Sequence, residues 1–139
     1  MTGWRQMGEQ MDLHTLSFAQ ITILREDIAE VVVNEGVEMN MDMVTEYHAF
    51  LLKHLKAPFS LLINKIYSYS YDFLAQRNLA ELKEIHSMAV VSYTSTSKQS
   101  TLALADGIVR DIPWNLQIFH DKDSALHWVE SQQNNLLPT

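Results

Sequence analysis

Two short apolar runs constrain the fold of this 139-residue chain more than any other feature. Residues 59–64 (FSLLIN) and 88–93 (MAVVSY) are each apolar and bounded by polar or helix-like segments. Such runs are typical of strands that are buried on both faces of a parallel sheet. Parallel strands need long crossover connections, which are usually helices. The two runs therefore predict an α/β fold.

Four amphipathic segments supply the helices. In residues 40–55 the apolar side chains recur at spacings of three and four, which indicates one buried helix face. Similar patterns predict helices from about residue 71 to 85, from 95 to 109, and from 121 onward. Pro58 and Pro113 lie just beyond the first and third of them. The candidate N-caps are Asn40 or Asp42, Ser70 or Asp72, residues 95–97, and Asp121 or Asp123.

The remaining strands come before and after this region. Residues 16–23 and 31–33 predict an antiparallel hairpin with its turn at 25–27, and residues 114–119 alternate as a last strand. The order β-β-α-β-α-β-α-β-α predicts a sandwich of four helices on a mixed five-stranded sheet. We expect one domain over residues 13–132, a poorly ordered lead-in over 1–12 and a tail over 133–139.

Composition narrows the classes of function. The formal charge of −7 argues against nucleic-acid binding, which needs a basic surface. No cysteine is present, so disulfides and thiolate metal sites are excluded. The histidines lack metal-site spacing and the glycines match no nucleotide fingerprint, so we predict no metal and no cofactor. Without a signal-like start or a membrane-length apolar run, the chain is predicted to be cytoplasmic.

Residues 66–73 (IYSYSYDF) are the most unusual stretch. They follow a predicted parallel strand, and ligands of open α/β sheets bind beyond the carboxyl ends of such strands. An extended backbone would place the tyrosines on one side as an aromatic surface. Alternatively, a serine caps the next helix and the rings cover the end of the sheet. The predicted binding residues are Tyr67, Ser68, Tyr69, Ser70, Tyr71 and Asp72.

The end of the domain carries a resemblance to a known family. The last predicted strand ends in Phe119, an acidic turn follows, and Ala125-Leu126-His-Trp128-Val129 begins a helix. With the element order over residues 14–131, this ending resembles the STAS domain of anti-sigma factor antagonists. It is most similar to the SpoIIAA-like group, which is related to the lipid-binding Sec14 fold.

The resemblance implies two kinds of site. Anti-sigma factor antagonists are phosphorylated on a serine near the start of the second helix, which makes Ser68 and Ser70 the candidate phosphoacceptors here. Their Asp-Ser-Ser/Ala-Gly motif is absent, because no Asp directly precedes either serine and no Gly follows. A Sec14-like groove for an apolar ligand would be lined by residues such as Met41, Val44, Phe50 and Tyr69.

Three functions follow from these patterns. The favoured one is a noncatalytic STAS-like regulatory module that binds a protein partner or a second copy of itself, as a homodimer, through residues 66–73. The second is a carrier or sensor of a small apolar ligand or lipid. The third is a hydrolase, which would require a histidine and a carboxylate to meet Ser68 or Ser70.

Overall fold

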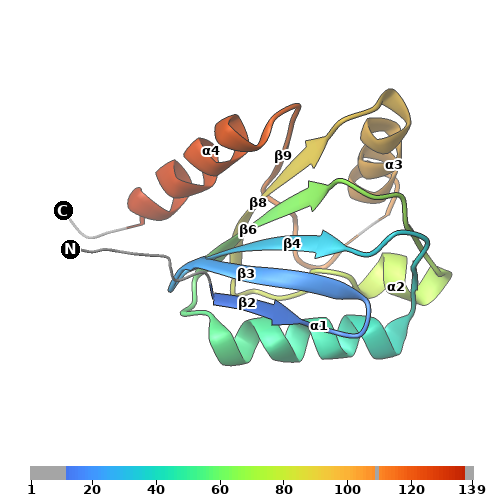
Figure 1. Cartoon of the computed structure of the whole chain (residues 1–139), viewed down its shortest axis with the longest axis horizontal. Helices are drawn as coiled ribbons and strands as arrows, with labels where there is room; N and C mark the ends of the chain where they lie inside the picture. Colours follow the sequence, from blue (N-terminus) through green and yellow to red (C-terminus); the bar gives the residue numbers. More distant parts are fainter. Residues whose placement is uncertain (1–11, 109, 137–139) are drawn as a thin grey trace.

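The computed structural model describes residues 12–108 and 110–136. It is an α/β structure built on a mixed sheet of six strands in the order β2-β3-β4-β6-β8-β9 (Figure 1). The strands are β2 (Asp12–Thr15), β3 (Ala19–Arg25), β4 (Ile28–Val33), β6 (Phe59–Lys65), β8 (Ile85–Ser92) and β9 (Leu116–Phe119). The predicted α/β class is confirmed.

Four helices accompany the sheet. They are α1 (Met41–His54), α2 (Phe73–Asn78), α3 (Ser95–Asp106) and α4 (Lys122–Asn134). Asn40, Asp72 and Asp121 cap α1, α2 and α4, and each side chain accepts a hydrogen bond from a backbone N–H three residues on. Thr94 does the same for α3, one residue before the predicted cap. Gln133, in the predicted tail, is buried within α4.

The predicted number of five strands is wrong, because β2 adds a sixth. It pairs antiparallel with β3, with Leu13 opposite Thr22. The chain reverses between the two strands, where the Leu16 N–H donates to the Ala19 carbonyl at 2.8 Å. Most of β2 is exposed, so its residues carry no apolar alternation. Backbone pairing at the sheet edge forms this strand, and the apolar pattern could not reveal it.

The second helix is much shorter than predicted. It ends at Asn78, and Ala80 then adopts the left-handed conformation with φ of 59°. The Ala80 N–H donates to His48 Nε2 on α1 at 3.1 Å. Leu79, Leu82 and Ile85 still pack against the core, so the apolar spacing is real although the helix does not continue.

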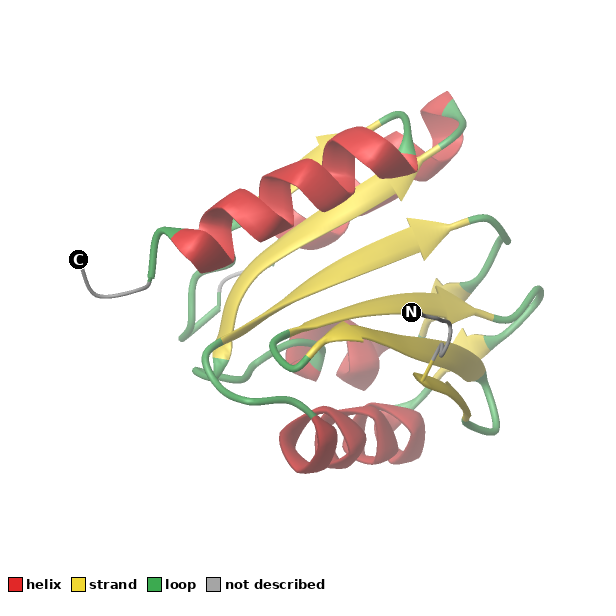
Figure 2. Cartoon of the chain, turned by 60° about the vertical axis from the view of Figure 1, so that its left-hand side comes forward, coloured by secondary structure: helices red, strands yellow, loops and turns green. Residues whose placement is uncertain are grey.

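The parallel strands determine which face each helix covers. β4, β6, β8 and β9 are parallel neighbours in sequence order. Right-handed crossovers that always advance in one direction place α1, α2 and α3 on the same face of the sheet. The last helix, α4, lies on the opposite face (Figure 2). A larger core forms under α1 and α2, and a smaller one under α4 contains Ile28, Leu62, Val91, Ala125 and Val129.

A buried polar network attaches α4 to the amino end of the sheet. Gln133, 3% exposed, donates to Asp27 Oδ2 at 2.9 Å and to the Pro58 carbonyl at 3.0 Å. It also accepts from Ser60, which bonds to Ser87. Every polar atom that the glutamine side chain buries has a partner, which offsets its desolvation.

We expect Gln133→Ala to lower the free energy of unfolding by about 2 to 3 kcal/mol, because Ser60, Asp27 and the Pro58 carbonyl each lose a hydrogen bond and a buried space is left behind. The matched control is Gln132→Ala on the same helix. Its side chain accepts a single exposed hydrogen bond from Asn115, so the expected change is below about 0.5 kcal/mol. Urea unfolding measures both, and equal losses would contradict the role assigned to the network.

No helix in the described part of the chain has both the length and the apolar character needed to cross a membrane.

Candidate functional site

The tyrosine and serine segment is tied down by a small second sheet. β5 (Glu38–Met39) pairs in parallel with β7 (Ser70–Tyr71), directly before the starts of α1 and α2. The Ser70 N–H donates to the Val37 carbonyl and the Asp72 N–H to the Met39 carbonyl, both at 2.9 Å. Backbone hydrogen bonds therefore hold the segment in place at the carboxyl end of β6.

The β5–β7 pairing turns some side chains of this segment inward and leaves others exposed. Tyr69 and Tyr71 turn inward and pack against the main core, with the Tyr71 hydroxyl donating to that of Tyr69 at 3.1 Å. Tyr67, Ser68 and Ser70 are exposed. The three tyrosines are thus divided, two lying under the surface and one on it.

Neither serine caps α2, since Asp72 does so by accepting from the Ala75 N–H at 2.8 Å. The Ser68 N–H donates to the Glu35 carboxylate at 3.1 Å, and Ser70 stands opposite Glu38 in the small sheet. Both hydroxyl-bearing residues therefore have acidic neighbours.

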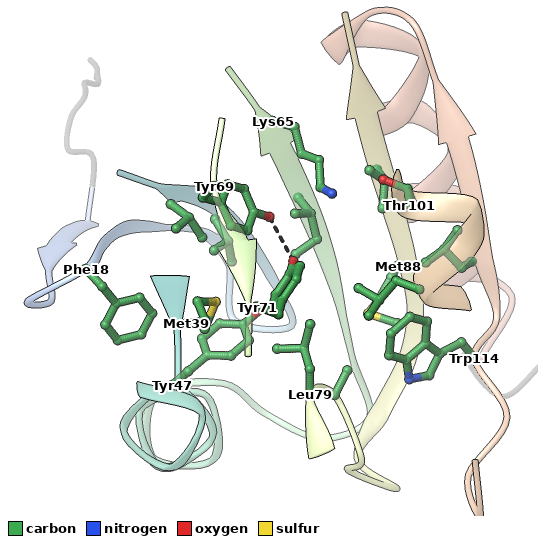
Figure 3. A pocket seen from close by; sticks show the side chains of 17 residues that line it. Phe18, Met39, Tyr47, Lys65, Tyr69, Tyr71, Leu79, Met88, Thr101 and Trp114 are labelled. Carbon is green, nitrogen blue, oxygen red and sulfur yellow. Dashed lines mark hydrogen bonds between the residues drawn. The ribbon is translucent and has the colours of Figure 1, made fainter. Parts of the chain in front are cut away.

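An apolar cavity of about 50 Å³ lies between the sheet and the three helices of one face (Figure 3). Residues from strands β4, β6, β8 and β9, helices α1 and α3, and the segment after α2 line it. The lining residues are Phe18, Val31, Val33, Met39, Tyr47, Ile63, Lys65, Tyr69, Tyr71, Leu79, Ala80, Met88, Val90, Thr101, Leu104, Trp114 and Leu116.

Lys65 is the cation among these residues. It is the last residue of β6 and lies on the same face of the strand as Phe59, Leu61 and Ile63. Its side chain therefore points to the face that α1, α2 and α3 cover. Its Nζ lies 5.3 Å from the ring centre of Tyr69 and points into the space between the tyrosines and Thr101 (Figure 3). Burial lowers the pKa of Lys65 to about 8. A lysine with this pKa is largely charged at neutral pH but incompletely solvated.

The tyrosine hydroxyls that line the cavity remain protonated and neutral. Burial raises the pKa of Tyr69 to about 12, and it also raises the pKa values of Tyr47 and Tyr71. Each of these side chains therefore offers a neutral O–H group at physiological pH.

Trp114 lines the side of the cavity farther along the sheet, and Arg110 packs on its ring from outside the lining. The Arg110 guanidinium, 4% exposed, donates to the carbonyls of Gln76 at 2.8 Å and Leu104 at 3.0 Å. It also lies 3.7 Å from the ring centre of Trp114. This arginine connects the end of α2 to α3 and supports the Trp114 ring that lines the cavity.

Of the four predicted groove residues, Tyr69 lines the cavity and the other three do not. Met41, Val44 and Phe50 do not line the cavity, which takes Met39 and Tyr47 from the same region. Val44 is buried on the inner face of α1. Phe50 instead stacks with His54 at 4.3 Å between ring centres, and His14 also packs on it.

A second feature of this edge is an exposed apolar surface, which we name the 66–74 surface. It consists of Ile66, Tyr67, Phe73, Leu74 and Tyr93, which are between 47% and 69% exposed. Ile66, Tyr67 and Tyr93 line one groove of about 220 Å³ beside the start of α3. The Tyr93 hydroxyl donates to Asn64 at 2.8 Å, which fixes this ring in place.

Residues 12–108 and 110–136 offer neither a metal-binding cluster nor a catalytic serine and histidine pair at this segment. No three His, Asp or Glu side chains in that part of the chain are grouped as metal ligands. No hydrogen bond there joins a histidine to Ser68 or Ser70. The nearest polar partners of the two serines are backbone groups and glutamates.

Sequence reasoning missed Lys65, Arg110 and Trp114. For Lys65 a signal existed, because a period of two from Phe59 places it on the inner face of its strand. Arg110 and Trp114 follow α3 in an irregular segment, where spacing gives no direction.

No family model, no curated protein and no solved structure matches this chain.

The lowered pKa of Lys65 predicts a pH-dependent stability. The unfolded lysine has a pKa of 10.5 and the folded one about 8, so between these values the unfolded state binds more protons. The free energy of unfolding therefore increases, through Lys65, as the pH rises from 8 to 10.5. We expect Lys65→Met to be more stable than the unsubstituted protein at pH 7, with a difference that shrinks toward pH 10.

The exposed Lys83 provides the control, since Lys83→Met removes the same charge outside the cavity. Urea unfolding between pH 7 and 10 compares the two variants. A constant difference for Lys65→Met across this range would contradict the buried position of its amine.

Proposed function

We propose that this chain is a noncatalytic, cytoplasmic STAS-like interaction module that forms a homodimer through the 66–74 surface. The observation that supports it is the exposure of Phe73, at 69%, together with Leu74 and Tyr67 on one edge of the domain. Monomeric proteins rarely expose several large apolar side chains together unless the surface binds something. Aromatic residues are also enriched at protein interfaces.

A second copy of the chain suits this surface. The protein carries a formal charge of −7, which opposes self-association through its polar faces. The five side chains of the 66–74 surface are uncharged, so two copies related by a twofold axis can pack these apolar groups against one another. The small sheet holds the backbone of this surface in place, which lowers the entropy cost of binding.

Ser68 and Ser70 give the module a point of regulation. Both are exposed within the segment that forms the surface, and both have glutamate neighbours, Glu35 and Glu38. A phosphate added to either serine would bring negative charge beside these carboxylates. We propose that phosphorylation there loosens the β5–β7 pair and weakens the dimer.

The dimer is tested by sedimentation at several protein concentrations. We expect a reversible dimer whose dissociation constant rises roughly tenfold or more in Phe73→Gln, because a central aromatic anchor is lost. The matched control is Leu52→Gln on α1, which is also exposed but lies outside the surface. A monomer at all concentrations, or equal effects of the two variants, would contradict the proposal.

A second candidate function is supported by the cavity. A space of about 50 Å³ with mostly apolar walls suits a carrier or sensor of a small apolar ligand. Native mass spectrometry of the purified protein at low activation energy is the first measurement. An added mass that leaves on activation would support a carrier, whereas a site that also stays empty when small ligands are added would count against it.

A further inference from the structure

The cavity has an amine and two tyrosine hydroxyls gathered at one end. Lys65 Nζ and the hydroxyls of Tyr69 and Tyr71 lie together near the carboxyl end of β6 (Figure 3). The other walls are formed mainly by aliphatic and aromatic carbon, from residues such as Val31, Met88 and Leu116. A ligand that fits this distribution has a polar head and an apolar body.

The polar end of the cavity is suited to bind a negatively charged group. Within residues 12–108 and 110–136 no carboxylate lies within 4.0 Å of Lys65 Nζ, so its charge has no ion-pair partner there. The Tyr69 ring compensates only in part, at 5.3 Å from the amine. Since Tyr71 donates to Tyr69, the proton of the Tyr69 hydroxyl is available to an acceptor in the cavity.

We propose that the cavity binds a short apolar monocarboxylate, whose carboxylate pairs with Lys65 Nζ and accepts a hydrogen bond from the Tyr69 hydroxyl. This inference rests on the second candidate function, that of a ligand carrier or sensor. One cation and one hydroxyl donor match a single negative charge, because a doubly charged phosphate would be left undercompensated among apolar walls.

The size of the cavity limits the ligand. A volume of about 50 Å³ accommodates only roughly three to five water-sized groups. Branched acids of about six heavy atoms match this space and its width, and long fatty acids exceed it. A suitable probe is therefore 2-methylpropanoate, with its neutral amide 2-methylpropanamide as the matched ligand of the same shape.

The test is a titration of the full chain with each probe, followed by two-dimensional ¹H–¹⁵N NMR. We expect saturable shifts at backbone amides around Lys65, Tyr69 and Met88 with the carboxylate, and at least about tenfold weaker binding of the amide. Octanoate should produce no such shifts. These outcomes together would establish both the cavity as a ligand site and its preference for an anion.

Two variants test which side chains cause the preference for the carboxylate over the amide. Lys65→Met keeps the volume and should remove the preference for the carboxylate over the amide, and Tyr69→Phe should weaken carboxylate binding severalfold. Lys83→Met, at an exposed lysine, should leave both unchanged.

Two outcomes overturn the inference in distinguishable ways. Equal binding of amide and carboxylate would retain a ligand site but remove the anion preference. Absence of saturable shifts with both probes would remove the carrier function as well.

Discussion

The parallel pairing of β4, β6 and β8 is the constraint on which the rest of the structure depends. These strands are buried on both faces, so each side must be covered by helices. Because the strands advance in one direction across the sheet, their right-handed crossovers place three helices on one face. That face contains the large core and the cavity, and among the helices of residues 12–108 and 110–136 only α4 covers the other face.

The same topology places both candidate surfaces at one edge. Loops that follow parallel strands meet beyond the carboxyl ends, where the segment after β6 pairs with the segment before α1. Its backbone hydrogen bonds turn Tyr69 and Tyr71 into the cavity and leave Tyr67 outside. A ligand near Lys65 would therefore contact the inner side of the segment whose outer side forms the 66–74 surface.

This arrangement relates the two candidate functions physically. Tyr69 and Tyr71 are joined by a hydrogen bond, and Tyr71 belongs to the strand that leads directly into Asp72, the cap of α2. Phe73 and Leu74 begin that helix on the outside. Tyr71, on the inner side, is therefore separated from the exposed Phe73 by a single residue, Asp72.

Apolar periodicity and capping chemistry are local, so the amino-acid sequence alone predicted the α/β class and the central strands and narrowed each of three helix caps to two candidates. The structure has Asn40, Asp72 and Asp121 at these caps rather than Asp42, Ser70 and Asp123. Only the tertiary structure decided the edge strand β2 and the early end of α2. Both depend on hydrogen bonds to distant segments, such as that from Ala80 to His48. The period of two in β6 places Lys65 on the inner face, but the cavity itself forms only when separate crossovers bring Lys65, Tyr47 and Trp114 to one face of the sheet.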